Sequence, residues 1–142
     1  MLKKILSISG KPGLFRLVSQ GHNSIIVESL DNGRRNAVYA NERIISLGDI
    51  SMYVEDGDKP LGEVLQALYD LQEGKPVENA IIKGSKEEIF DLFEKILPDY
   101  DRDRVYQNDV TKLLKWYNAL LRNNITEFTE PEEEKENKKE EE

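Results

Sequence analysis

The first third of the chain consists of short runs in which apolar or β-branched residues alternate with polar ones, a pattern typical of β-strands. Turns rich in glycine separate the runs, and Asn32-Gly33 favours a type I′ hairpin turn because both residues tolerate positive φ. The expected strands are residues 4–9, 14–19, 24–30, 35–40 and 50–54. Because one flat sheet would leave a face and its edges bare, we expect a strongly bent meander that closes partly into an SH3-like barrel.

The second half of the chain changes to an apolar period of three to four residues, which predicts amphipathic helices. The expected helices run from residue 61 to before Gly74, from a capping box at Ser85 to Pro98, and from a cap at Asn108 or Asp109 to residue 121. Residues 80–82 are expected to form a short extended piece between the first two helices. Three amphipathic helices of this length can bury one another's apolar stripes and the side of the barrel.

These patterns predict an α+β fold with two folded parts and a tail. Residues 1–56 are expected to form the small β barrel or bent meander, and residues 57–125 the three-helix domain, with the junction at residues 55–60. Residues 126–142 are expected to be a disordered acidic tail, because residues 130–142 carry no apolar side chain beyond proline.

The charge is distributed unevenly along the chain. The 142 residues carry 28 acidic and 20 basic side chains, for a net charge of −8. Residues 1–54 nevertheless have a net charge of +3, whereas residues 55–129 have −6 and residues 130–142 have −5. The tail is therefore expected to act as a solubilising segment, and the alternative is an electrostatic mimic that competes for the basic N-terminal part.

Several classes of chemistry are excluded or disfavoured by the composition. The chain has no cysteine, which excludes disulfides, thiol catalysis and thiolate metal sites, and its single histidine excludes a site built on two or three imidazoles. No apolar run approaches the roughly 20 residues that cross a bilayer, and the first residues lack the features of a signal peptide. We expect a cytoplasmic protein with no membrane association, no cofactor, no metal and no catalytic residue.

Three local patterns that resemble known sites do not match them. Asp99, Asp101 and Asp103 alternate as in a calcium loop, but an EF-hand counted from the first of them would need glycine and a carboxylate where Arg104 and Val110 stand. The residues at 10–13, Gly-Lys-Pro-Gly, lack the spacing of a phosphate-binding loop and are interpreted as a structural turn. The one histidine, in the loop at residues 20–23, is interpreted as solvated.

Basic and aromatic residues of the β part are the candidate partner-binding site. Arginines beside aromatic rings on a small barrel can bind an acidic peptide or a single-stranded nucleic acid. The candidates are Phe15, Arg16, Arg34, Arg35, Tyr39 and Arg43. Strand alternation places Arg16 on the face opposite Phe15. The structural alternative is an ordinary charged exterior in which the arginines keep strand edges from pairing.

The last predicted helix is also cationic. Lys112, Lys115 and Arg122 lie between Asp109 and Glu127 with no acidic residue among them. A helix with its acid first and its bases last is stabilised by its own dipole, so this order needs no ligand to explain it. Trp116 borders the apolar stripe and is interpreted as packing where the barrel meets the helices.

Two longer blocks of the N-terminal part are Ile8-Ser9-Gly10-Lys11-Pro12-Gly13-Leu14-Phe15-Arg16-Leu17 and Ile45-Ser46-Leu47-Gly48-Asp49-Ile50-Ser51-Met52-Tyr53. Together with shorter blocks at residues 26–30 and 38–40, they resemble a family of small bacterial proteins known as a domain of unknown function. The similarity runs from about residue 2 to about residue 122. It implies an N-terminal domain, a helical C-terminal domain and a bacterial cytoplasmic setting, and it implies no activity or catalytic residue.

The leading functional hypothesis is a non-enzymatic interaction module that binds a protein partner or an acidic polymer. The alternative is a nucleic-acid-binding protein that uses the face of Arg16, Arg34, Arg35 and Arg43, with the acidic tail as competitor. An enzyme ranks third, because the chain has so few reactive side chains.

Overall fold

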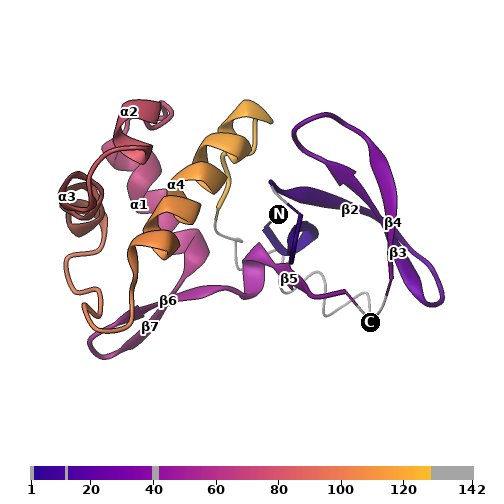
Figure 1. Cartoon of the computed structure of the whole chain (residues 1–142), viewed down its shortest axis with the longest axis horizontal. Coiled ribbons are helices and arrows are strands. Elements are labelled where there is room, and N and C mark those ends of the chain that lie inside the picture. The colour runs from indigo at the N-terminus through magenta and orange to yellow at the C-terminus, as the bar shows by residue number, and fades with distance from the viewer. Residues whose placement is uncertain (1, 12, 40–41, 129–142) are drawn as a thin grey trace.

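A computed structural model describes residues 2–11, 13–39 and 42–128, which form a β-sheet beside a layer of helices (Figure 1). The sheet has five antiparallel strands in the order β4-β3-β2-β1-β5. Their bounds are β1 Ile5–Ile8, β2 Phe15–Gln20, β3 Ser24–Ser29, β4 Arg35–Tyr39 and β5 Ile44–Ser46. The α+β class is confirmed, and the first four strands lie where the alternation predicts them. The short fifth strand was not predicted.

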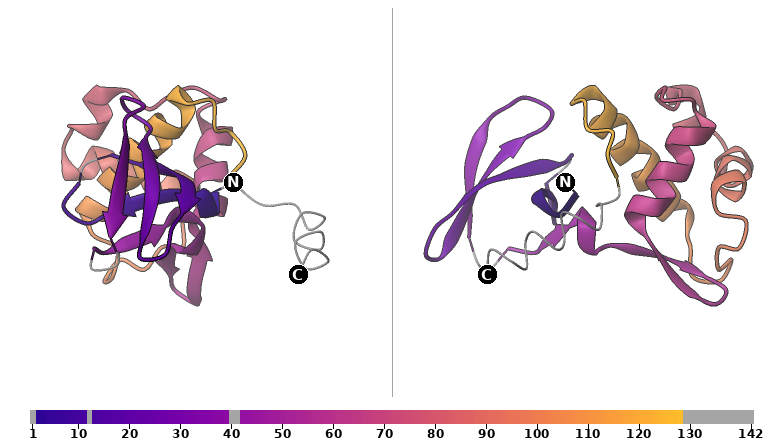
Figure 2. Two further views of the ribbon diagram at one scale, coloured as in Figure 1. Left: turned by 90° about the vertical axis from the view of Figure 1, so that its right-hand side faces the viewer. Right: turned by 180° about the vertical axis from the view of Figure 1, so that it is seen from behind.

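The sheet is twisted and open (Figure 2). Strands β1 to β4 form the expected meander, and β5 pairs with the free edge of β1. Within the described residues no pairing joins β4 to β5, so the predicted barrel closure is not observed. One face instead carries its own apolar cluster, made of Leu6, Ile8, Phe15, Val27 and Val38.

The turn between β3 and β4 differs from its predicted type. Gly33 has a φ of +74°, but Asn32 is not among the described residues with positive φ, as a type I′ turn would require. The Asn32 side chain instead accepts a hydrogen bond from the Arg34 backbone N–H. Leu30 donates its backbone N–H to Leu14 and is buried, which draws the turn toward the core and explains the longer loop.

The strand predicted at residues 50–54 lies outside the five-stranded sheet. It is β6, Ser51–Val54, and it forms a hairpin with β7, Gly57–Pro60. The predicted junction at residues 55–60 is therefore a hairpin turn followed by a strand. Val54 also bridges Tyr100, which attaches this hairpin to the helical part of the molecule.

Four helices follow: α1 Leu61–Leu71, α2 Asn79–Ile82, α3 Lys86–Ile96 and α4 Gln107–Arg122. The predicted cap of α3 is confirmed, because the Ser85 hydroxyl accepts a hydrogen bond from the Glu88 backbone N–H. Helix α4 begins slightly before its predicted cap, and the Asp109 carboxylate accepts from the Tyr106 backbone N–H. The expected extended piece at residues 80–82 is instead part of the single turn α2. No helix of the described part is long and apolar enough to span a membrane.

One apolar core joins the sheet to the helices. Ile5, Leu14 and Leu30 come from the sheet region, yet they belong to the same cluster of buried side chains as the helix residues. Leu47, in the short 3-10 helix η2 (Leu47–Asp49), belongs to it too. The helix contribution includes Val64, Leu65, Phe93, Leu114 and Leu120. The two predicted parts are therefore packed together through a shared interior.

The folded part extends beyond the predicted start of the tail at residue 126. Phe128 is buried against Tyr69 and Tyr117, with ring centroids 5.7 and 6.3 Å away. A Cβ on Gly62 would collide with the Phe128 carbonyl, so the helix start and this segment lie in direct contact. Residues 126–128 are therefore not part of a disordered tail, and residues 129–142 lie outside the described residues.

Two side chains of α4 fix the connection between α1 and α2. The Asn118 amide accepts from the Val77 backbone N–H and donates to the Val77 carbonyl, both at 2.8 Å. The Tyr117 hydroxyl donates to the Lys75 carbonyl at 2.9 Å. Burial raises the pKa of Tyr117 to about 12. Lys75 and Val77 lie between α1 and α2, where no helix pairs their backbone groups. The bonds from α4 satisfy these groups and thereby hold α2 beside α4.

Replacing Leu14 with alanine tests whether the interior is shared. Leu14 is fully buried, and we expect Leu14→Ala to lower the free energy of unfolding by about 3 kcal/mol. In urea denaturation, the fluorescence of Trp116, which reports on the helices, and the far-UV circular dichroism should shift together. Leu71→Ala is the control, since that side chain is 43% exposed and should cost under about 1 kcal/mol. An unchanged Trp116 transition would mean that the two parts unfold separately.

The pKa of Tyr117 predicts a loss of stability in alkali. Because the folded pKa lies near 12 and an unfolded tyrosine titrates near 10, the stabilisation is complete below pH 10 and is lost as the pH rises toward 12. Tyr117→Phe removes this ionisation and one hydrogen bond. The variant should be less stable than the original protein by about 1 kcal/mol at pH 8, and the difference should shrink between pH 10 and 11.5. Urea melts at several pH values measure it, and a constant difference would contradict the assignment.

Candidate functional site

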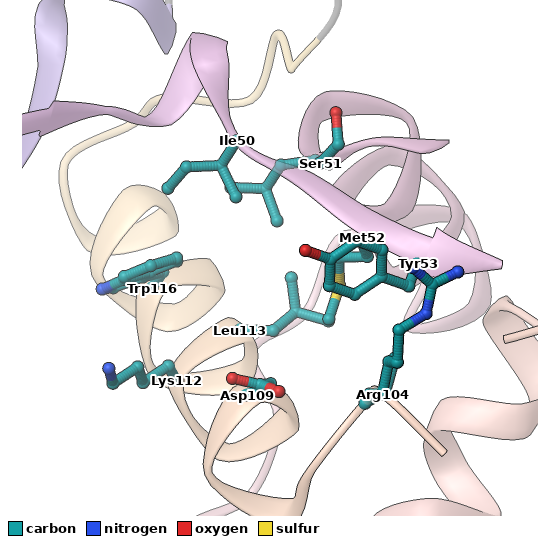
Figure 3. A pocket seen from close by; sticks show the side chains of 11 residues that line it. Ile50, Ser51, Met52, Tyr53, Arg104, Asp109, Lys112, Leu113 and Trp116 are labelled. Atoms are coloured by element: carbon teal, nitrogen blue, oxygen red, sulfur yellow. The ribbon is translucent and has the colours of Figure 1, made fainter. Parts of the chain in front are cut away.

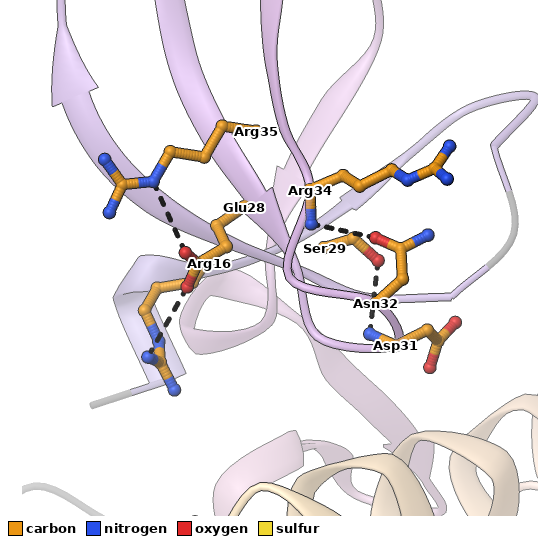
Figure 4. Close-up of polar contacts among 7 residues, drawn as sticks. All are labelled: Arg16, Glu28, Ser29, Asp31, Asn32, Arg34 and Arg35. Carbon is orange, nitrogen blue, oxygen red and sulfur yellow. Dashed lines mark hydrogen bonds and ion pairs between the residues drawn. The ribbon is translucent and has the colours of Figure 1, made fainter.

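Two of the candidate arginines meet around one carboxylate on the face of the sheet opposite Phe15. In the strand register, Arg16 lies opposite Glu28 and Glu28 lies opposite Arg35. The guanidinium of Arg35 is 3.3 Å from the Glu28 carboxylate and that of Arg16 is 4.0 Å from it, as Figure 4 shows. A shared carboxylate neutralises part of both charges, so this row of side chains is a weak attractor for anions.

The other four candidates lie elsewhere. Phe15 is 7% exposed and packs in the cluster on the opposite face, as strand alternation predicts. Arg34 is in the β3–β4 turn and points away from Arg35 (Figure 4). Tyr39 is 58% exposed at the far end of β4, and Arg43 is exposed just before β5. The structure therefore brings together only Arg16 and Arg35 of the six.

Several cations line a cleft between the sheet and α4. We call it the cationic cleft; its volume is about 700 Å³. Its charged lining residues are Lys11, Lys83, Lys112, Lys115, Arg122 and Asp31. Five cations thus accompany one carboxylate in a protein whose net charge is −8.

Ion pairs account for only part of this charge. Asp31 lies 3.5 Å from Arg122, which links the β3–β4 turn to the end of α4. Lys11 lies 3.5 Å from Glu42. Among the described residues, no ion pair is found for Lys83, Lys112 or Lys115. These three ammonium groups therefore dominate the potential within the cleft.

Each wall of the cleft is positioned by local structure. The β1–β2 turn carries Lys11, and it reverses direction through Gly10 and Gly13, whose φ values are +83° and +82°. Spacings of three to seven residues place Lys112, Lys115 and Arg122 on one side of α4. Lys83 immediately follows α2, which the bonds of Tyr117 and Asn118 hold against α4. The cleft is therefore a product of the tertiary fold.

A smaller cavity of about 190 Å³ lies on the β6 side of α4 (Figure 3). We call it the Trp116 pocket. It is lined by Ile50, Ser51, Met52, Tyr53, Leu61, Arg104, Val105, Asp109, Lys112, Leu113 and Trp116. Lys112 and Trp116 also line the cationic cleft, so the two cavities are neighbours on α4.

The outer wall of the Trp116 pocket is a chain of charged and aromatic contacts. The Arg104 guanidinium lies 4.4 Å from the centroid of the Tyr53 ring and bonds the Asp101 carboxylate at 2.8 Å. That bond lowers the pKa of Asp101 and raises the pKa of Arg104. The Asp103 backbone N–H also donates to Asp101. The aspartate-rich loop that resembles a calcium loop thus uses its central carboxylate to hold an arginine.

The residues of the cationic cleft were not predicted as a site. The acid-free run of Lys112, Lys115 and Arg122 was visible in the sequence, but the helix dipole explained it equally well. Lys11 and Lys83 are 72 residues apart in the chain, and no local pattern indicates that their segments face the same helix. The one sequence feature that could have indicated the site is the contrast between this cationic helix and the acidic chain as a whole.

The cleft and the Trp116 pocket have the chemistry of binding sites for anionic and apolar groups. Lysine ammonium groups and backbone N–H groups hold anions without a fixed bond geometry. His22 is exposed in the β2–β3 loop, away from both cavities. Among the described residues no group of three or more histidine, aspartate or glutamate side chains is arranged to hold a metal ion.

Comparisons with known proteins agree with the resemblance noted in the sequence. One domain of unknown function, DUF5606, matches residues 2–47, and a second, DUF6852, matches residues 50–120. No curated protein matches the chain. A solution NMR structure of a Bacteroides vulgatus protein, a structural genomics target, is 48% identical, covers 90% of this chain and 91% of its own, and gives a TM-score of 0.74. The chain therefore belongs to the family of proteins in which DUF5606 is followed by DUF6852.

Proposed function

We propose that this protein is a non-enzymatic binding module whose cationic cleft binds an acidic segment of a partner protein. The observation that carries the proposal is the set of five cations and one already paired carboxylate that line the cleft of a protein with net charge −8. A local field of this kind raises the local concentration of an anionic ligand and orients it.

A protein segment fits the cleft better than a nucleic acid. Proteins that bind single strands combine a basic groove with several aromatic rings on which bases stack. Trp116 is the one aromatic residue among those lining the cleft, and it is partly buried against the core. The arginines that favoured nucleic acid in the sequence are divided between a pair that shares Glu28 and separate positions on the sheet.

The absence of catalysis is part of the proposal. The titratable side chains of the cleft are four lysines, one arginine and Asp31, which pairs with Arg122. A general base or nucleophile would need a neighbouring group that adjusts its pKa, and the carboxylate that lines this cleft is already held by Arg122. The set is suited to holding an anion in place.

Charge reversal on α4 tests the proposal. The probe is a fluorescein-labelled peptide of eight glutamates, whose binding is measured by fluorescence anisotropy in 50 mM salt. Lys112→Glu combined with Lys115→Glu should weaken binding at least tenfold, because two attractive contacts become repulsive. Affinity for the original protein should also fall as salt rises, since exposed charges are screened.

The matched control is Lys86→Glu combined with Lys95→Glu on α3. It changes the net charge by the same amount at exposed positions outside the cleft, so binding should change less than twofold. Equal loss in both double variants would show that only the overall charge matters and would contradict the proposal. A labelled oligonucleotide of eight thymidines that binds more tightly than the peptide would favour the nucleic-acid function instead.

A further inference from the structure

We propose that the Trp116 pocket is a second binding site, which takes one apolar side chain from the same acidic segment that occupies the cationic cleft. This inference rests on the proposed function and adds the feature that gives it specificity. The partner segment would then carry acidic residues followed or preceded, within a few positions, by a single residue such as leucine.

The interior of the pocket is apolar and sized for one side chain. Met52, Leu61 and Leu113 form its floor and are each at most 8% exposed. A volume of about 190 Å³ is below the range of about 300 to 1,000 Å³ typical of small-molecule sites. It is comparable to the space that one large aliphatic residue occupies. Filling it removes apolar surface from water on both partners.

The rim of the pocket is held in place before anything binds. Tyr53 is 46% exposed, yet its ring is covered by the Arg104 guanidinium and its carbonyl accepts the Asp101 backbone N–H at 3.0 Å. Asp101 in turn binds Arg104. Figure 3 shows Tyr53 and Arg104 on one side, facing Asp109, Leu113 and Trp116 of α4 on the other. A rim fixed in this way loses little entropy on binding.

The position of the pocket links it to the cleft. Lys112 and Trp116 line both cavities and are one helical turn apart. A peptide with a carboxylate at Lys112 therefore needs only a few residues to place a side chain beside Trp116. A peptide held only by its acidic side chains can shift along the cleft, because any of them can pair with the lysines. An apolar side chain in the pocket fixes the peptide at one position.

Charge complementarity and the sequence of the chain itself identify the occupant. The five cations of the adjoining cleft favour an acidic segment. At the pocket itself Arg104 is paired with Asp101, and one further cation, Lys112, is matched by one acid, Asp109, so the nearly neutral rim and the buried apolar floor favour an apolar group on that segment. The acidic stretch of this chain at residues 130–142 has no apolar side chain except Pro131. It matches the charge of the cleft but offers no anchor of the required kind. An external segment of a partner protein therefore fits both cavities.

Two series of labelled peptides test the inference. Each peptide has four glutamates, a spacer of one to four glycines and a final leucine or serine, and each is also made with the order of its parts reversed. Affinities for the full chain are measured by fluorescence anisotropy. At least one leucine peptide should bind about tenfold more tightly than its serine counterpart, because burial of a leucine side chain contributes roughly 1.5 to 3 kcal/mol before ordering costs.

The variants separate the pocket from the cleft. Tyr53→Ala removes part of the rim, and the advantage of leucine over serine should fall below threefold, while the affinity of the serine peptide stays within twofold. Tyr39→Ala, which removes another exposed tyrosine on the sheet, should leave the advantage unchanged. Isotope-labelled protein should show amide shifts at Met52 and Leu113 with the leucine peptide only.

The outcomes distinguish this inference from the proposed function. If leucine and serine peptides bind equally at every spacing, and Lys112→Glu with Lys115→Glu weakens both, the cleft is a binding site and the inference about the pocket is wrong. If no peptide binds, the proposed function fails as well. A protein dimer, detected by light scattering, that the leucine peptide dissociates would assign the pocket to a second copy of the chain and also overturn the inference.

Discussion

The shared apolar core is the constraint on which the rest of the structure depends. A five-stranded sheet of this size has only one small apolar cluster of its own, and a unit this small buries a limited share of its surface. Ile5, Leu14 and Leu30 extend its interior into the helical layer, where they join the residues of α1, α3 and α4. The sheet and the helices are therefore fixed in relation to each other, and the space between them has a defined shape.

That fixed relation creates a site from segments that are ordinary when taken separately. The β1–β2 turn and the end of α2 each contribute one lysine, Lys11 and Lys83, and α4 contributes three cations, and none of these segments is a binding motif. The ion pair between Asp31 and Arg122 crosses from the β3–β4 turn to α4, and the side chains of Tyr117 and Asn118 attach the segment before α2. Packing thus concentrates lysines that the sequence separates by many residues.

Features of the fold that have local causes could be predicted from the sequence, and features that depend on tertiary packing could not. Ser85 and the stripe around Leu113 predict their helices because capping and periodicity act within a few residues. The strand at residues 51–54 was predicted correctly as a strand. Its pairing with β7, outside the five-stranded sheet, depends on the burial of Met52 and Val54 against the helices. The turn at Asn32 was predicted from its dipeptide, whereas the burial of Leu30 decides its form. Neither the cleft nor the Trp116 pocket has a local signal, because each needs three or more separate segments.

A bound anion is repelled by the acidic side chains of the protein and attracted by the lysines of the cleft, and the two forces act over different distances. Beyond a Debye length of about 8 Å at physiological salt, the exposed acidic side chains of the protein are largely screened. Within the cleft the three lysines without an ion pair among the described residues lie close to any ligand and are screened less. A long polyanion would extend beyond the cleft along a protein whose net charge is −8, and repulsion from its other acidic side chains would reduce the affinity. A short acidic segment avoids this cost, so the charge distribution of the molecule favours a limited stretch of negative charge over an extended one.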